Sequence, residues 1–301
     1  MTFHPRLSFP NLSSLTVPRS YFLGHHSAGL ERMRGLVSTM DVIVEVRDYR
    51  TPLTSRNPLF EQLVGSRARV VVYTKRDLGS TGSAADRARE QIIARWAQKT
   101  AGSGSDHDNN GDGESRGVQQ VVDFCKRQHE AADNGRSHLF GTRVLVVGMP
   151  NVGKSTLPGV TRKVGTAIKI VMLKLAVCGN VKDGIVPAVT MADYLLYHVN
   201  LHAPDSYGAW SEPTNEIGQV LGGLARRQGR LKKGGEPDYE AAALQFIQKW
   251  RAGHLGRFVL DEVSDEAVAR REALVQAMGG SWNQARRAIK MERKVQAAAR
   301  A

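Results

Sequence analysis

The chain has 301 residues, which is long enough for a sizeable core and two domains. With 41% hydrophobic and 24% charged residues, its composition excludes a mainly disordered or fibrous protein. No stretch approaches the ~18 uninterrupted apolar residues of a membrane-spanning helix. The net charge of +13 favours a polyanionic partner, either nucleic acid or a membrane surface. The isolated Cys125 and Cys178 are typical of reduced thiols and not of a disulfide framework or zinc site.

The N-terminal segment has the composition of an organelle targeting sequence. Residues 1–30 carry Arg6, Arg19 and several serines but no Asp or Glu. We therefore assign residues 1–20 as a mitochondrial targeting segment. A floppy N-terminus is the alternative, because three prolines interrupt any long amphipathic helix here.

Strands and helices alternate over the first two thirds of the chain. Runs rich in β-branched residues predict three strands, at residues 42–46, 68–73 and 143–147. Helical composition follows the second strand, at residues 84–99 and 118–130, and a polar low-complexity run between these helices predicts a disordered insertion at residues 101–117. The alternation indicates an α/β domain with a mostly parallel sheet, which we assign to residues 21–200.

Strand patterns fade after residue 200, where the chain becomes helical and basic. Helices are predicted at residues 237–252, 261–278 and 282–301, the first of them ending at Gly253. We assign residues 201–301 to a smaller, basic, all-α C-terminal domain. Three apolar residues of its first helix are predicted to be core and not ligand-stacking groups: Phe246, Ile247 and Trp250.

A phosphate-binding loop follows the third strand. The sequence GMPNVGKS, from Gly148 to Ser155, fits the pattern G-x-x-x-x-G-K-[ST] in the required position after a strand. Its backbone N–H groups would surround a β-phosphate, while Lys154 would reach the β- and γ-phosphates and Ser155 would ligate Mg²⁺. A chance glycine-rich turn is the structural alternative, and the loop alone does not separate GTP from ATP.

A base-reading motif follows the second strand. The sequence TKRD, from Thr74 to Asp77, resembles the N-K-x-D guanine motif, with Thr74 in place of the usual Asn. A carboxylate at Asp77 can accept both the N1–H and the amino N–H of guanine, a donor pair that adenine lacks, and the stem of Lys75 can cover the base. A polar turn is the structural alternative.

The order of the two motifs is reversed relative to ordinary GTPases, because the guanine motif precedes the phosphate loop. This order, with both motifs at strand ends, indicates a circular permutation. Further segments support the same interpretation: Gly24-His25, and residues 48–58, 158–165, 173–197 and 234–258. Together they resemble the YlqF-type circularly permuted GTPases, in the mitochondrial GTPase 1 branch of ribosome-assembly factors. The resemblance implies a P-loop, three-layer α/β GTPase domain followed by a smaller all-α domain.

The resemblance also implies functional residues. The nucleotide, GTP with Mg²⁺, would be held by the following residues: Thr74, Lys75, Arg76, Asp77, Gly148, Asn151, Val152, Gly153, Lys154, Ser155, Thr156 and Thr161. Among these, Ser155 and Thr161 would meet the metal ion. The catalytic histidine would be His25, with His26 adjacent to it.

The resemblance implies partners and a location as well. The implied partner is the large mitochondrial ribosomal subunit with its rRNA, and the implied place is the mitochondrial matrix. Inner-membrane contact stays open as an alternative, because basic helices also bind anionic lipid. No obligate oligomer is expected. One basic stretch would bind RNA: Arg226, Arg227, Arg230, Lys232 and Lys233.

The chain departs from the family in two places. The first helix after the phosphate loop is nearly absent, because Leu157 runs directly into Pro158. The strand and D-x-x-G motif of switch II are missing before Leu173, and the D-x-x-G matches at Asp108 and Asp205 follow no predicted strand. Either coding sequence is missing or the loss is real, and in both cases we expect poor GTP hydrolysis. A non-enzymatic rRNA-binding protein with a decayed nucleotide site is the alternative function, whereas an ATP-dependent kinase is disfavoured by the guanine motif.

Overall fold

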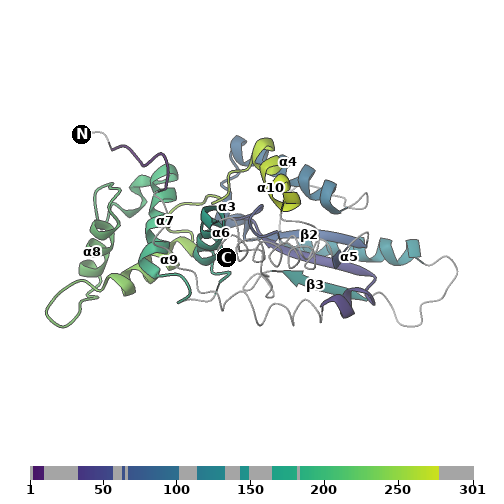
Figure 1. The fold of residues 1–301 in the computed structure, drawn as a ribbon, viewed down its shortest axis with the longest axis horizontal. Coiled ribbons are helices and arrows are strands. Elements are labelled where there is room, and N and C mark those ends of the chain that lie inside the picture. The colour runs from purple at the N-terminus through teal and green to yellow at the C-terminus, as the bar shows by residue number, and fades with distance from the viewer. Residues whose placement is uncertain are drawn as a thin grey trace, which may run out of the picture.

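The computed structural model describes residues 3–9, 33–56, 63–64, 67–101, 114–132, 143–148, 165–181 and 184–277 (Figure 1). Its sheet contains three parallel strands in the order β2-β1-β3: β1 (Val42–Asp48), β2 (Ala68–Thr74) and β3 (Val144–Gly148). All three lie where β-branched runs predict them, each extending one or two residues further toward its carboxyl end. The predicted α/β class with a parallel sheet is confirmed.

Four helices accompany the sheet: α3 (Arg76–Gly79), α4 (Ala84–Ala101), α5 (Glu114–Ala132) and α10 (Asp265–Ala277). Helix α4 packs on β2, and α5 contacts β1 and β2. The predicted disordered insertion at residues 101–117 is too long at both ends, because Ala101 ends α4 and residues 114–117 begin α5. The rest of that insertion lies outside the described residues.

Helix α10 begins four residues later than the sequence predicts. The Ser264 hydroxyl accepts a hydrogen bond from the Ala267 N–H at 3.1 Å, and the Ser264 carbonyl accepts one from Val268 at 3.0 Å. These are the bonds of an N-cap residue, so the helix begins after Ser264. Asp261, predicted as the first helical residue, lies in the preceding loop. The predicted helix at residues 282–301 lies outside the described residues.

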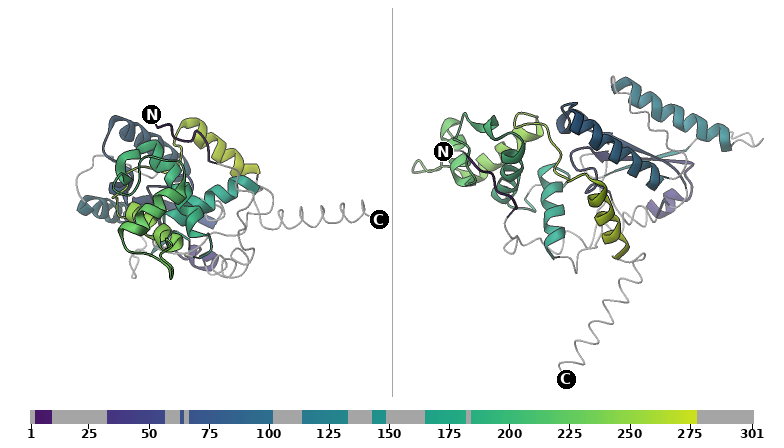
Figure 2. Two further views of the ribbon diagram at one scale, coloured as in Figure 1. Left: turned by 90° about the vertical axis from the view of Figure 1, so that its left-hand side faces the viewer. Right: turned by 90° about the horizontal axis from the view of Figure 1, so that it is seen from above.

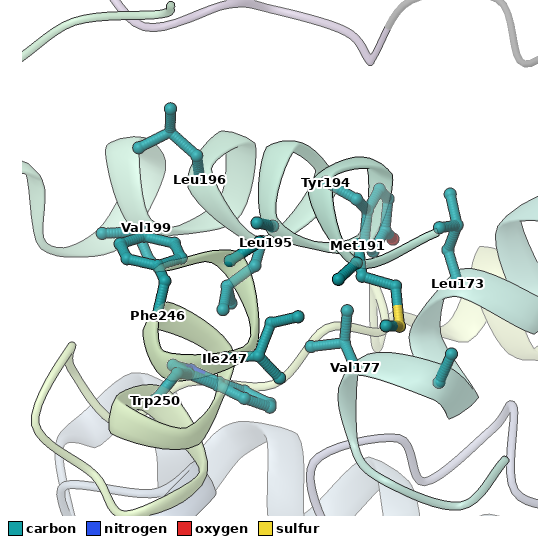
Figure 3. Close-up of a cluster of buried hydrophobic side chains, with 14 of the residues drawn as sticks. Leu173, Val177, Met191, Tyr194, Leu195, Leu196, Val199, Phe246, Ile247 and Trp250 are labelled. Carbon is teal, nitrogen blue, oxygen red and sulfur yellow. The ribbon is translucent and has the colours of Figure 1, made fainter. Parts of the chain in front are cut away.

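The helical part of the molecule contains α6 (Gly165–Val177), α7 (Ala188–His202), the 3₁₀ turn η2 (Pro204–Tyr207), α8 (Ile217–Arg227) and α9 (Tyr239–Arg251). Helix α9 packs against both α7 and α8. Figure 3 shows α7 and α9 contributing side chains to one apolar cluster. Phe246, Ile247 and Trp250 are at most 1% exposed, which confirms their predicted place in the core.

Both ends of α9 follow local sequence signals. The Asp238 carboxylate accepts the Ala241 N–H at 3.1 Å and caps the first turn. Gly253 adopts φ = 83°, and its N–H donates to the Trp250 carbonyl at 2.8 Å. This left-handed residue ends the helix where the sequence predicts. The described part of the chain contains no helix both long and apolar enough to cross a membrane.

Candidate functional site

The two predicted nucleotide motifs converge at one edge of the sheet. Parallel strands present their carboxyl ends on the same side, and the register pairs Asp48 with Thr74 and Val46 with Gly148. The TKRD turn (residues 74–77) and the first glycine of the phosphate loop therefore lie on either side of the end of β1. Ligands of open α/β sheets bind outside this carboxyl edge. Motifs far apart in sequence are thus brought to one candidate site.

The TKRD turn has an unusual backbone conformation. Lys75 has φ = 60° and is the one non-glycine residue with positive φ that the structure describes. This left-handed conformation costs roughly 1–2 kcal/mol for a residue with a Cβ. The Lys75 ammonium donates to the Asp48 carboxylate at 3.2 Å. That contact holds the side chain at the carboxyl edge of the sheet.

Thr74 is fixed to the central strand by hydrogen bonds. Its hydroxyl donates to the Arg47 carbonyl at 3.2 Å, and its own carbonyl accepts the Tyr49 N–H at 3.0 Å. Thr74, which replaces the usual asparagine, therefore still anchors the turn, and it does so by hydrogen bonds to the backbone at the end of β1. The start of the guanine motif is positioned by the sheet itself.

The two motif residues after Lys75 are both exposed, but Arg76 is engaged in an ion pair. Arg76 donates to the Glu90 carboxylate at 2.8 and 2.9 Å, and this bonding raises the pKa of the guanidinium. Asp77 is exposed to solvent. Gly79 allows α3 to approach the sheet, because an added Cβ would lie 2.7 Å from a Tyr49 ring carbon. The exposed carboxylate is the group that the guanine hypothesis requires.

A buried ion pair at the end of β1 joins this turn to the helical part. Asp48 accepts from Arg50 at 3.0 and 2.8 Å. Burial alone would raise the pKa of Asp48, but the hydrogen bonds and charges of Arg50 and Lys75 outweigh it and lower the pKa. The Arg50 guanidinium also donates to the Cys178 carbonyl at 3.1 Å and lies 4.9 Å from the centre of the Trp250 ring. The sequence gives no signal for this connection.

A second buried carboxylate, Asp261, fixes the loop after β1. It accepts from the backbone N–H groups of Leu53 and Thr54 at 2.9 and 2.8 Å, and from the Thr54 hydroxyl at 2.6 Å. The Lys174 ammonium donates to it at 2.9 Å. Burial opposes ionisation of Asp261, but these partners lower its pKa. The loop at the candidate site is therefore fixed from α6 and from the segment before α10.

The start of the phosphate loop requires a glycine. A Cβ on Gly148 would lie 2.6 Å from the Val46 carbonyl oxygen, which belongs to the backbone of β1. The other predicted nucleotide, metal and catalytic residues lie outside the described residues: Asn151, Val152, Gly153, Lys154, Ser155, Thr156, Thr161, His25 and His26. Among the residues that the structure does describe, no three His, Cys, Asp or Glu side chains form a metal-binding group.

The predicted RNA-binding cations lie together on a compact turn at the far side of the helical part. This basic turn (residues 226–233) comprises the last two residues of α8 and the residues after it, and the Arg230 N–H donates to the Ala225 carbonyl at 2.9 Å. A bridge between Leu231 and Pro237 closes the turn. All five cationic residues are exposed: Arg226, Arg227, Arg230, Lys232 and Lys233. The turn thus presents concentrated positive charge to solvent.

Comparison with known proteins gives a consistent set of relatives, although no family model matches the chain. Mitochondrial GTPase 1 of Schizosaccharomyces japonicus is 33% identical over 316 positions, which cover 85% of this chain and 94% of the relative. Mitochondrial ribosome-associated GTPase 1 of Mus musculus is 30% identical, covering 80% of this chain and 89% of the relative. The structure of GNP-bound YlqF from T. maritima is 15% identical, with a TM-score of 0.48 over 79% of this chain and 99% of that one.

The alignment with the S. japonicus protein also shows a difference in length. Since 85% of 301 residues is about 256, about 60 of the 316 aligned positions have no residue in this chain. The relative therefore carries sequence, inside the matched region, that this chain lacks.

Proposed function

The chain belongs to the mitochondrial GTPase 1 family, and on that premise we propose that it binds guanine nucleotides and assists assembly of the large mitochondrial ribosomal subunit. The observation that carries the proposal is the convergence of the TKRD turn and Gly148 at one sheet edge. Relatives named as ribosome-associated and ribosome-biogenesis GTPases support the ribosomal partner.

In this proposal each motif has one task. The exposed Asp77 carboxylate accepts both guanine donors, while Lys75, fixed by Asp48, lays its stem along the base. The phosphate loop that begins at Gly148 surrounds the phosphates, with Lys154 at the β- and γ-oxygens. Bound nucleotide would order the neighbouring segments and favour the ribosome-bound state.

The metal and the catalytic group are proposed from residue chemistry. Ser155 and Thr161 carry hydroxyl oxygens, the kind of ligand that Mg²⁺ takes in phosphate sites, where the ion neutralises phosphate charge. His25, or the adjacent His26, would assist the attacking water. We expect slow hydrolysis, because no D-x-x-G stands between the phosphate loop and Leu173 and because about 60 positions of the alignment with the S. japonicus relative have no residue in this chain.

The lack of a D-x-x-G motif between the phosphate loop and Leu173 also favours a second candidate function. A chain whose nucleotide site has decayed would remain a non-enzymatic rRNA-binding protein, using the basic turn alone. Nucleotide affinity separates the two candidates, since only the first requires the converging motifs to bind a ligand.

A nucleotide titration tests the proposal. Purified protein is titrated with fluorescent GTP, GDP and ATP in the presence of Mg²⁺, beside an Asp77→Ala variant. We expect guanine nucleotides to bind selectively and Asp77→Ala to lose the selectivity. Absence of binding to all three nucleotides would reject the proposal in favour of the RNA-binding candidate. Single-turnover hydrolysis is expected to be slow, and robust turnover would contradict that part.

The ribosomal half of the proposal rests on the basic turn. Binding of large-subunit rRNA is measured against salt for a Lys232→Ala/Lys233→Ala variant and for a control lacking two exposed cations elsewhere, Arg95→Ala/Arg270→Ala. Each lost phosphate contact lowers the log–log salt slope by ~0.7–0.9, so the first variant should lose about 1.5 units. Equal slopes for the two variants would reject this contact.

We propose the mitochondrial matrix as the place of action, on the names of the relatives. Anionic lipid of the inner membrane is the competing target for the basic turn. Sedimentation with cardiolipin vesicles, at the ionic strength of the RNA assay, distinguishes a lipid contact from an RNA contact.

A further inference from the structure

An extended N-terminal segment lies along the helical part of the molecule. Residues 3–9, which we call the strap, run beside α7, far from the sheet (Figures 1 and 2). The Arg6 guanidinium donates to the Asp193 carboxylate of α7 at 2.6 Å. About one fifth of the Arg6 side chain and one quarter of the Asp193 side chain remain exposed. A half-buried, charge-assisted contact of this kind fixes an extended chain in register.

The strap also inserts an aromatic side chain. The Phe9 ring meets the Tyr194 ring edge-on at a centroid distance of 5.1 Å, and Tyr197 at 6.0 Å. Phe9 packs against the main apolar cluster, and the Arg6 guanidinium lies 5.6 Å from the centre of its ring. The aromatic surface of α7 is thus covered by a residue almost two hundred positions away in sequence.

Backbone groups of the strap are bound as well. The Asn215 side chain accepts the Arg6 N–H at 3.3 Å and donates to the His4 carbonyl at 3.0 Å. The buried Asn200 donates to the same Asn215 oxygen at 3.2 Å, which orients the amide. The Tyr197 hydroxyl donates to the Leu7 carbonyl at 3.4 Å. The strap is therefore held as an extended peptide, through its main chain at residues 4, 6 and 7 and through the side chains of Arg6 and Phe9.

We propose that α7 and Asn215 form a binding surface for residues 3–9, and that the mature protein keeps these residues as a strap on its helical part. A targeting peptide that is cut away contributes nothing to the folded protein, whereas Phe9 packs against the main apolar cluster and Arg6 pairs with Asp193 of α7. Cleavage beyond Phe9 would expose the Tyr194 and Tyr197 rings and leave Asp193 without its cation. The proposal that the mature protein keeps its N-terminal residues applies to residues 3–9 alone. This part of the inference rests on the proposed mitochondrial location, whereas the docking of the strap does not.

Limited proteolysis of the purified full chain tests the docking. Trypsin cleavage after Arg6 is followed by intact mass in the native protein, in Asp193→Ala and in a control, Glu212→Ala, which removes an exposed carboxylate from the same helical part. We expect Asp193→Ala to accelerate this cleavage about tenfold and the control to leave it unchanged. Cleavage of the native chain as fast as in urea, or no effect of Asp193→Ala, would overturn the proposal.

A charge exchange keeps the test decisive if the alanine variant folds poorly. Asp193→Arg should lower the Tm by about 2–4 °C, and adding Arg6→Glu should restore at least half of the loss. A double variant no more stable than Asp193→Arg would overturn the docking.

Retention is tested by peptide mapping of the protein isolated from cells. An N-terminal peptide that includes Arg6 and Phe9, in mitochondrial fractions, supports the strap, and a mature N-terminus beyond Phe9 overturns it. Recovery outside mitochondria would reject the proposed location, and the proteolysis result would still decide whether the strap is docked.

Discussion

Asp261→Asn tests how strongly the loop beside the candidate site depends on a distant residue. The carboxylate is 3% exposed and accepts four hydrogen bonds, from Leu53, Thr54 and Lys174. Asparagine keeps one acceptor oxygen, places an amide donor among donors, and leaves the Lys174 ammonium without its anion. Breaking a buried ion pair on one side costs about 3–5 kcal/mol. Because Lys174 keeps some contact with solvent, we expect the lower figure, ~3 kcal/mol, or a Tm lower by about 6–12 °C.

The pH dependence of the same variant checks the cause. The folded-state pKa of Asp261 lies below the unfolded value of 3.8, so ionisation stabilises the protein above pH ~4, and this contribution is lost as the pH falls through the folded pKa. The Tm difference between the native chain and Asp261→Asn should therefore be full at pH 7 and shrink on acidification below pH ~4. Scanning fluorimetry measures it, with the exposed Asp265→Asn as a control expected to shift the Tm by less than about 2 °C. A pH-independent difference, or one no larger than the control, would refute the reasoning.

Three further predictions concern single side chains. Asp77→Asn should weaken GTP binding about 100-fold and improve XTP binding, since the amide can donate to the extra carbonyl of xanthine; competition titration with both nucleotides checks this. Burial raises the pKa of Cys178 to about 12, so iodoacetamide at pH 8 should alkylate Cys125 in the folded chain and leave Cys178 unlabelled. Peptide mass spectrometry measures the labelling, and labelling of both cysteines would contradict this expectation. Gly148→Ala should lower the Tm by about 2–6 °C and abolish nucleotide binding, because its Cβ would collide with the β1 backbone, and unchanged affinity would show that the loop tolerates it.

Local patterns were sufficient for the sheet and for the convergence of the motifs. Residues 42–46 read as a buried strand, and β1 is buried along almost its whole length. Its Glu45 does not interrupt the strand, since Arg47 pairs with it at 2.7 Å and Arg69 at 3.3 Å. Once three parallel strands are predicted, the meeting of the TKRD turn and Gly148 follows from topology alone.

Contacts between distant residues could not be predicted in the same way. Asp261 reads as an acidic first-turn residue of a helix, because nothing near it indicates the Leu53 and Thr54 amides some two hundred residues earlier. Arg50 gives no sign of Trp250, and Arg6 reads as a targeting arginine until Asp193 is placed beside it. Each role depends on tertiary structure that brings the partner within reach, and periodicity and propensity carry no such information.

Strand β3 lies at an edge of the described sheet and exposes two valines, and we relate this exposure to the sequence that the chain lacks after the phosphate loop. Among the described residues β3 pairs with β1 alone, and Val144 and Val146 are 39% and 54% exposed, although strands of this kind normally bury β-branched side chains. The family resemblance implies a strand and a D-x-x-G motif between the phosphate loop and Leu173, and this chain has no D-x-x-G in that interval. Its alignment with the S. japonicus relative leaves about 60 positions without a residue in this chain.

We expect the transcript to contain additional in-frame sequence between the codons for Leu157 and Met172. Sequencing the transcript across them checks this directly. A chain that includes the added sequence should hydrolyse GTP faster than the present one. A Val146→Cys reporter in it should react more slowly with thiol reagents, because the restored helix would cover the face of the sheet on which this side chain lies. An uninterrupted transcript would contradict the expectation, and the open edge would then be a feature of a protein that retains RNA binding after losing switch II.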